Sequence, residues 1–132
     1  MSVVFALATP PAQSAICVFR VSGKGCLNAV EKIFNKPVQK HTTFCIRKLL
    51  HQGRVVDEVG VITFSSPNSY TGEDAFEVYG HGSLGVMSLI VEVFKGVRFE
   101  EPAPGEFTKR AFLNYKLSLN EAESVADIIE SN

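Results

Sequence analysis

Residues 66–85 read SPNSYTGEDAFEVYGHGSLG, and the rest of the chain is organised around this stretch. It opens with a turn cluster at Pro67-Asn68-Ser69, because Pro, Asn and Ser each favour turn geometry. Residues 75–79 are predicted to form a short strand. The glycine-rich residues 80–85 are predicted to form a bend in which backbone N–H groups can approach a partner closely.

Within the predicted strand, one charged residue lies between apolar neighbours. Side chains alternate along a strand, so Phe76 and Val78 face one side of the sheet and Glu77 faces the other. A partly buried carboxylate without a partner costs several kcal/mol. Glu77 is therefore expected to have a cationic or N–H partner.

Composition predicts a single globular domain. The chain has 132 residues, 45% of them hydrophobic and 20% charged. It carries 13 Lys and Arg against 14 Asp and Glu, a net charge of −1 that gives no global field for a polyanion. If the parent protein binds RNA, this domain is therefore not expected to be its main contact.

Cysteine usage and hydropathy predict a cytoplasmic protein. Three cysteines without CxxC spacing indicate a reducing compartment, and the N-terminus lacks the pattern of a signal peptide. The longest apolar run, residues 86–94, is interrupted by polar residues and is shorter than the roughly 20 residues that a membrane span needs. No membrane segment is expected.

The first half of the chain is predicted to be mostly strands. Apolar and β-branched runs predict strands over residues 3–8 and 15–22, and a hairpin around Gln52-Gly53. The hairpin strands are residues 42–50 and 55–64. A helix after residues 22–25 carries an apolar stripe of Leu27, Val30, Ile33 and Phe34.

The second half is predicted to be mostly helical. Ser83 caps a helix that runs to Phe94 and is buried between layers, and residues 97–100 form another strand. Residues 106–114 form a helix with Lys109 and Arg110 facing outward. A capping box at residues 118–121 then starts a helix with a stripe of Ala122, Val125, Ala126 and Ile129. Because this stripe still continues at Asn132, the chain is expected to be a fragment of a longer protein.

Gly80-x-Gly82-x-x-Gly85 matches the dinucleotide-binding pattern. It follows a predicted strand, starts a predicted helix and precedes the acidic Glu100 and Glu101 by about twenty residues. However, only residues 102–132 follow, and they are predicted to be helical rather than to supply further βα units. Glycines that fit a tight strand-to-helix turn are the favoured interpretation, and a dinucleotide site remains an alternative.

Other site types are discounted. The sequence has no P-loop, and His41 and His51 have no third metal ligand at useful spacing. Three charged residues in apolar or tightly turned settings are left without a role: Arg20, Glu77 and Lys116. A structural ion pair or solvated strand ends would also account for them.

Several stretches taken together resemble one family. They are, in order along the chain, residues 6–11 (ALATPP), 19–23 (FRVSG), 67–74 (PNSYTGED), 80–82 (GHG), 104–114 (PGEFTKRAFLN) and Lys116-Leu117. Over essentially its whole length the chain resembles the N-terminal domain of the MnmE family, also called TrmE, of tRNA modification GTPases.

The resemblance implies an α+β fold with a mixed β-sheet and packed helices, similar to the folate-binding aminomethyltransferases. Residues 1–117 would be a folate-binding and homodimerisation domain, and residues 118–132 the first helix of a truncated helical domain. The GTPase domain, with its GTP, magnesium and potassium, would lie outside this chain, which is expected to be inactive alone. With an FAD-containing MnmG-type partner, the parent enzyme would add an aminomethyl or carboxymethylaminomethyl group at C5 of the wobble uridine of tRNA.

The resemblance also implies a cofactor and its contacts. A tetrahydrofolate derivative, in the 5-formyl or 5,10-methylene form, would contact Arg20, Glu77 and Lys116. Glu77 could accept the parallel N–H donors of a pterin, while Arg20 and Lys116 could hold carbonyl or carboxylate oxygens, including those of the glutamate tail. No catalytic or metal-binding residue is expected in this chain.

Three places depart from the family pattern. They are Ala12-Gln13-Ser14 in place of a Gly-Arg-Gly type of turn, Ser83 in place of a second glycine, and Tyr115 before the lysine. These changes are expected to affect ligand affinity and pose more than the fold. Two rival interpretations remain: a dinucleotide-binding oxidoreductase fragment, and a structural dimerisation module whose folate site has decayed.

Overall fold

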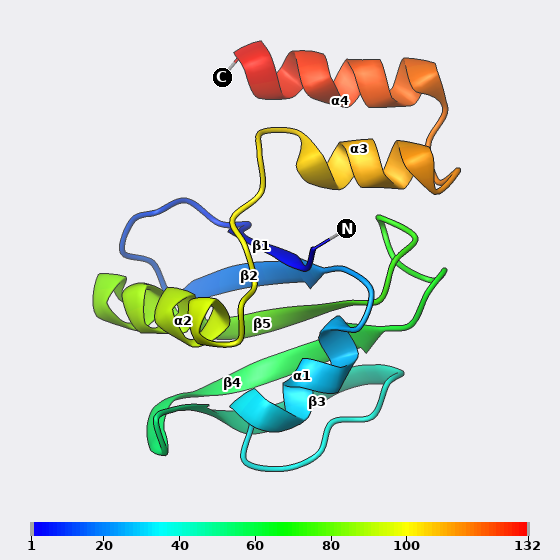
Figure 1. Ribbon diagram of the computed structural model, residues 1–132. Coiled ribbons are helices and arrows are strands. Elements are labelled where there is room, and N and C mark those ends of the chain that lie inside the picture. Colours follow the sequence, from blue (N-terminus) through cyan, green and yellow to red (C-terminus); the bar gives the residue numbers. More distant parts are fainter. Residues whose placement is uncertain (1, 132) are drawn as a thin grey trace.

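The computed structural model describes residues 2–131, and the side chains of Thr42 and residues 126–131 are not described. Strands and helices alternate irregularly along the chain, and Figure 1 shows one sheet with helices packed around it. The strands are β1 (Val4–Leu7), β2 (Ile16–Ser22), β3 (Thr42–His51), β4 (Arg54–Phe64) and β5 (Ala75–His81). The helices are α1 (Cys26–Ile33), α2 (Leu84–Gly96), α3 (Glu106–Leu113) and α4 (Leu119–Ser131).

The five strands form one sheet in the order β1-β2-β5-β4-β3, and each neighbouring pair is antiparallel. The α+β class is confirmed. The expectation of a mixed sheet is wrong for these strands, since the one parallel pairing described is an isolated bridge between Val4 and Glu100. The predicted strand over residues 97–100 is also wrong. Val97 donates its N–H to the carbonyl of Val93, so the chain leaves α2 in a turn.

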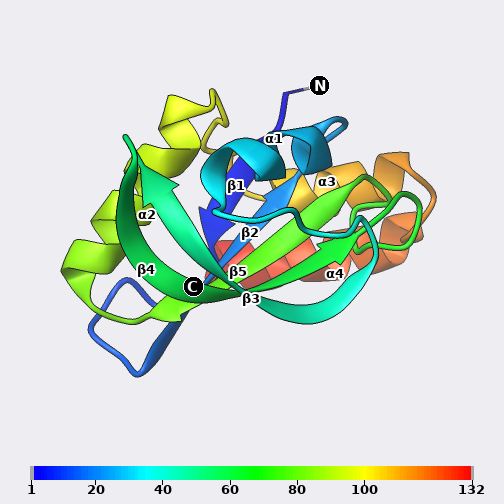
Figure 2. The same ribbon diagram turned by 90° about the horizontal axis from the view of Figure 1, so that it is seen from below.

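Helices α1 and α2 lie on one face of the sheet, as Figure 2 shows from below. The side chains of the strands that point to this face are buried, as the predicted alternation requires: Cys17, Phe19, Val21, Phe76 and Val78. Phe94 of α2 lies at the centre of the core, where its ring centroid is 5.2 to 6.2 Å from those of four other phenylalanines. Aromatic pairs of this kind stabilise a core by more than their buried area alone would predict.

Helix α2 begins as predicted but is less buried than predicted. Ser83 is its N-cap and accepts a hydrogen bond from the backbone N–H of Val86 at 3.2 Å. However, Leu84 is 57% exposed and Leu89 is 39% exposed. The helix therefore covers one sheet face instead of lying between two layers.

The predicted hairpin and the predicted capping box are both confirmed. Gln52 and Gly53 both have positive φ, 52° and 77°, as a two-residue hairpin turn between β3 and β4 needs. Ser118 and Glu121 exchange hydrogen bonds at the start of α4, and this bonding holds the pKa of the Glu121 carboxyl below its ordinary value. Ala126 and Ile129 of the predicted stripe lie outside the described side chains.

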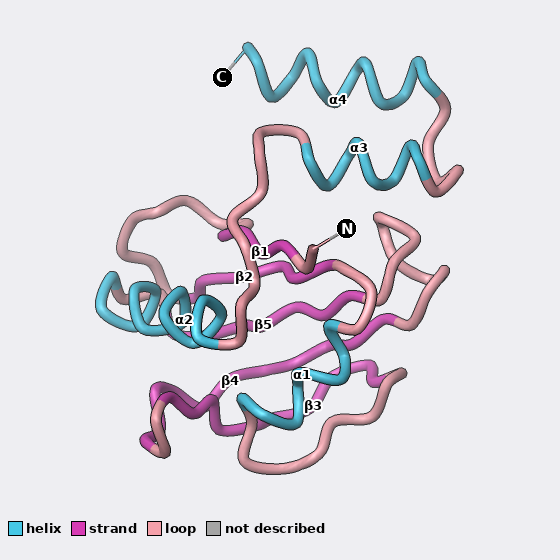
Figure 3. Tube along the Cα trace, viewed as in Figure 1, coloured by secondary structure: helices cyan, strands magenta, loops and turns pink. Residues whose placement is uncertain are grey.

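Helices α3 and α4 lie beside β1, at the opposite end of the molecule from β3 (Figure 1). In Figure 3 the loop between β4 and β5 extends toward the end of α3. Its Ser66–Pro67 peptide bond is cis. Within residues 2–131 no helix is long and apolar enough to cross a membrane.

Candidate functional site

A cleft of about 750 Å³ lies where the sheet meets the β4–β5 loop and the two C-terminal helices. Its wall combines charged, aromatic and aliphatic side chains from six elements and the loop, among them Arg20, Phe64, Tyr70, Glu77, Phe107 and Val125. A second hollow of about 660 Å³, between β1 and α2, is mostly apolar and has Glu101 as its one charged lining residue. A ligand-orienting site needs a few polar groups in an apolar wall, so the first cleft is the candidate.

Two of the three predicted site residues meet in this cleft. Arg20 on β2 and Glu77 on β5 are direct cross-strand neighbours, and Arg20 Nε lies 2.9 Å from Glu77 Oε2. The expectation of a cationic partner for Glu77 is confirmed. The Arg20 side chain is 62% exposed against 18% for Glu77, so this pair adds at most about 1 kcal/mol to stability. Its effect is to fix the direction of the carboxylate.

Tyr79 holds the other carboxylate oxygen, and the sequence analysis missed it. Its hydroxyl donates to Glu77 Oε1 at 2.6 Å. This hydrogen bond, followed by burial, raises the pKa of Tyr79 to about 12. The strand alternation already placed Tyr79 beside Glu77, because residues two apart on a strand share one face.

The ring of Tyr79 is itself supported by β3 and β4. The centroid of the Phe44 ring lies 6.2 Å from that of Tyr79. Phe44 can reach this position because Gly60 has no side chain, and a Cβ there would overlap the Phe44 ring. A row of contacts thus runs across the outer face of the sheet, from Phe44 through Tyr79 and Glu77 to Arg20.

Lys116, the third predicted site residue, is not part of the cleft wall. Its Nζ donates to the carbonyl oxygen of Pro67 at 3.2 Å, and its side chain lies beside Gly72. It therefore contacts the β4–β5 loop, whose Tyr70 faces the cleft. The structure brings Arg20 and Glu77 together, whereas Lys116, which follows α3, is bound to the β4–β5 loop.

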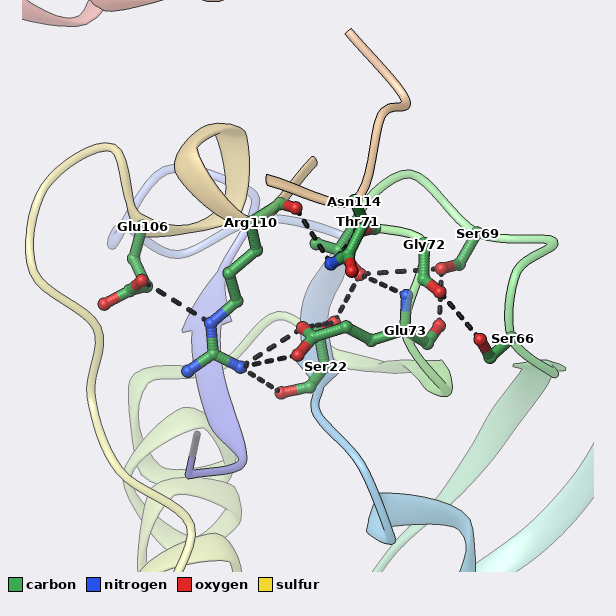
Figure 4. Close-up of polar contacts among 9 residues, drawn as sticks. All are labelled: Ser22, Ser66, Ser69, Thr71, Gly72, Glu73, Glu106, Arg110 and Asn114. Atoms are coloured by element: carbon green, nitrogen blue, oxygen red, sulfur yellow. Dashed lines mark hydrogen bonds and ion pairs between the residues drawn. The ribbon is translucent and has the colours of Figure 1, made fainter. Parts of the chain in front are cut away.

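A buried ion pair joins that loop to α3 (Figure 4). Arg110 is only 2% exposed, and its NH1 lies 3.2 Å and 3.3 Å from the two carboxylate oxygens of Glu73. The expectation that Arg110 points outward is wrong. One turn earlier on the same side of α3, Glu106 accepts from Arg110 Nε at 3.5 Å. The helical pattern placed Arg110 correctly on the helix but could not show that a carboxylate from a distant loop meets it.

Hydroxyl and amide groups extend this ion pair into a network. Ser22, at the end of β2, bonds to Thr71 Oγ1 at 2.6 Å and to Glu73 Oε1 at 2.9 Å. Asn114, after α3, donates to the carbonyl of Thr71 at 2.9 Å. Tyr70, directly before Thr71, bonds to Thr108 of α3 at 3.2 Å. The network therefore fixes the loop and helix that form one wall of the cleft.

The glycine motif has a structural explanation. Gly80 is not in a bend, as predicted, but pairs with Cys17 inside the sheet. A Cβ at Gly82 would overlap Ser14, whose backbone N–H donates to the carbonyl of Gly82 at 2.9 Å. The close approach at Gly82 is thus made by the chain itself, which favours the interpretation of tight-turn glycines.

Two cysteines and a histidine that could act as nucleophiles or metal ligands are buried or paired within the chain. Burial raises the thiol pKa of Cys17, and it raises that of Cys26 to about 12, so both stay protonated at neutral pH. His81 pairs with Asp57 through Nδ1 at 2.8 Å. In the described part of the chain, no three His, Cys, Asp or Glu side chains are grouped to hold a metal ion.

We expect Arg110→Met to destabilise the protein by about 3 kcal/mol, because it leaves the Glu73 carboxylate buried without its cation. The measurement is the urea midpoint. Lys109→Met, at the exposed neighbouring position, is the control and should change stability by less than about 0.5 kcal/mol. Adding Glu73→Gln to Arg110→Met should recover part of the loss, and equal losses for both methionine variants would contradict the pair's role.

We expect Tyr79 to ionise late in an alkaline titration followed by tyrosinate absorbance. Its folded pKa of about 12 exceeds the value of about 10 in an unfolded chain, so its stabilising contribution is present below pH 10 and is lost as pH rises through 12. Tyr79→Phe identifies the transition by removing it. Glu77→Gln should move the transition to lower pH, and an unchanged transition would show that Glu77 does not hold the hydroxyl.

Comparison with known proteins shows the family of this chain. The family model described as "GTP-binding protein TrmE N-terminus" matches residues 3–116. Similar curated proteins are named tRNA modification GTPase MnmE. Those of Thermotoga petrophila, Flavobacterium johnsoniae and Francisella philomiragia are 44%, 42% and 40% identical over 99%, 98% and 98% of this chain.

The chain spans 28% to 29% of the length of these three relatives. The match nevertheless includes both cleft residues Arg20 and Glu77, the network residues Glu73 and Arg110, and Lys116. The chain therefore belongs to the TrmE N-terminus family, the N-terminal domain of MnmE.

Proposed function

We propose that this chain is the tetrahydrofolate-binding and homodimerisation domain of a tRNA modification GTPase. The proposed parent enzyme adds an aminomethyl or carboxymethylaminomethyl group at C5 of the wobble uridine of tRNA, together with an FAD-containing MnmG-type protein. The observation that carries the proposal is the Glu77 carboxylate, which lies in a cleft lined partly by aromatic side chains and is bound by Arg20 on one oxygen and by Tyr79 on the other.

The chemistry of this cleft suits a pterin. A carboxylate has about four acceptor positions, so Glu77 can accept the 2-amino and ring N–H donors of a pterin while Arg20 and Tyr79 remain bound. Phe64, Tyr70 and Phe107 line the same cleft and can contact the ring system. Its volume of about 750 Å³ falls in the range of small-molecule sites.

The charged tail of a folate needs cations at the rim. The exposed guanidinium of Arg20 can bind a ligand carbonyl or carboxylate. We place Lys116 in the same role, reached from the loop where it bonds to the Pro67 carbonyl. The ligand would be the 5-formyl or 5,10-methylene form.

The remaining parts of the proposal concern the parent protein. Residues 1–117 would form the folate-binding domain, similar in fold to the aminomethyltransferases, and residues 118–132 would start a helical domain. GTP, magnesium and potassium would bind in a GTPase domain outside this chain, which is proposed to be inactive alone. The three cysteines are unpaired, which fits a cytoplasmic location.

The folate proposal predicts a specific thermal shift. A reduced folate at 100 times its dissociation constant should stabilise the chain by about 2.7 kcal/mol, or several degrees in Tm. Glu77→Ala should abolish this shift because it removes the acceptor for the pterin N–H groups. The variant should still unfold cooperatively in urea, at a midpoint lowered by the loss of the Tyr79 hydrogen bond, by about 1 kcal/mol.

The controls separate the rival interpretations. Glu58→Ala removes an exposed carboxylate from the neighbouring strand β4 and should leave the folate shift intact. An undiminished shift in Glu77→Ala would overturn the assignment of the site. A response to NAD alone would favour the oxidoreductase fragment, and no response to folate or NAD would favour a structural module whose site has decayed.

For the homodimer, we propose the outer face of the sheet, opposite α1 and α2, as the contact. Phe44, Ile46 and Ile16 are 53%, 52% and 57% exposed on this side. We expect light scattering to give twice the chain mass, and Ile46→Lys to lower it by placing a charge in the contact. Leu89→Lys, on the exposed side of α2, is the control. If the unsubstituted 132-residue chain is a monomer, dimerisation by this domain alone is contradicted.

A further inference from the structure

Positive charge is concentrated in one segment of the chain. Residues 32–56 contain six of the 13 Lys and Arg residues and none of the 14 Asp and Glu residues. The remaining residues contain seven cations and all 14 carboxylates. The net charge of −1 therefore conceals a basic segment and an acidic remainder.

The fold places this basic segment at one edge of the sheet. It comprises the end of α1, the loop of residues 34–41, strand β3 and the start of β4. Figures 1 and 2 show α1, the loop and β3 together, on the opposite side of the sheet from α3 and α4. Lys32, Lys36 and Lys40 are all exposed there.

Hydrogen bonds to its backbone hold the lysine-bearing loop in place. Arg47 donates to the carbonyl of Pro37 through Nε at 3.1 Å and NH2 at 2.8 Å. Asn35 bonds to the backbone N–H and carbonyl of Lys48 at 2.8 Å and 3.1 Å. Ser65 donates to the carbonyl of Lys40 at 3.0 Å. The lysines are thus presented by an ordered loop, which lowers the entropy cost of binding.

Within the described part of the chain, no ion pair neutralises the lysines and arginines of this edge. Among the described residues, the ion pairs join carboxylates to Arg20, His51, His81, Lys95 or Arg110. His51, at the far end of β3, is the one member of the segment that takes part. Three carboxylates lie next to the segment. Glu31 is on α1, and Glu58 faces Lys48 across β3 and β4. The third, Asp57, is paired with His81.

We propose that this basic edge, defined by Lys32, Lys36, Lys40 and Arg47, binds the phosphate backbone of tRNA. Exposed lysines act as point charges for phosphate, and such contacts orient a nucleic acid without reading its sequence. The identity of the polyanion rests on the proposed function, because the similar proteins are named tRNA modification GTPases. The folate cleft would lie on the side of α3 and α4, away from the bound backbone.

The test measures binding of the whole chain to fluorescently labelled tRNA by anisotropy over a range of salt concentrations. The variant Lys36→Gln/Lys40→Gln should weaken binding and reduce the slope of log K against log salt by about 0.7 to 0.9 per lost phosphate contact. Lys95→Gln/Lys109→Gln removes the same charge from exposed positions outside the edge and should leave both quantities nearly unchanged.

Two outcomes would overturn the proposal. If both pairs of substitutions weaken binding equally, only net charge matters and no surface is defined. If the unsubstituted chain does not bind tRNA, the lysines serve instead to protect the exposed β3 edge from pairing with other strands. The folate shift of Lys36→Gln/Lys40→Gln should stay normal, so failure here is distinguishable from failure of the folate proposal.

Discussion

The buried pair of Arg110 and Glu73 is the interaction on which the arrangement of the site depends. Arg110 belongs to α3 and Glu73 to the β4–β5 loop, and Ser22 adds the end of β2 to the same network. Burying a charged guanidinium that is 2% exposed costs a large desolvation free energy unless a carboxylate and further acceptors surround it. This requirement fixes the loop, the helix and the strand relative to one another, and with them the cleft.

The cleft joins two kinds of support. The sheet holds the Glu77 carboxylate rigidly, because Arg20 and Tyr79 each bind one of its oxygens. The opposite wall, with Tyr70 and Phe107, depends on the polar network. A ligand that spans the cleft would therefore contact both the sheet and the wall formed by the loop and helices. The resulting division, with recognition on the sheet and enclosure by loop and helices, is common in binding sites placed on rigid scaffolds.

The sheet also separates two electrostatic environments. Carboxylates outnumber cations in the remainder of the chain, most clearly in α4, whereas β3 carries a lysine and an arginine without a carboxylate of its own. Over a distance beyond the Debye length of about 8 Å, such surfaces act nearly independently at physiological salt. An almost neutral chain can thus offer an anion-binding edge and a separate ligand cleft.

The sequence by itself determined the local elements and one feature of the site. Hydrophobic periodicity, the Ser83 cap and the Gln52-Gly53 turn depend on neighbouring residues, so they were predictable, as was the need of Glu77 for a partner. The burial of Arg110, the support from Tyr79, the absence of Lys116 from the cleft wall and the antiparallel strand order depend on contacts between residues far apart in the chain. Only the tertiary structure decided these, because periodicity assigns a side chain to a face but does not show what that face meets.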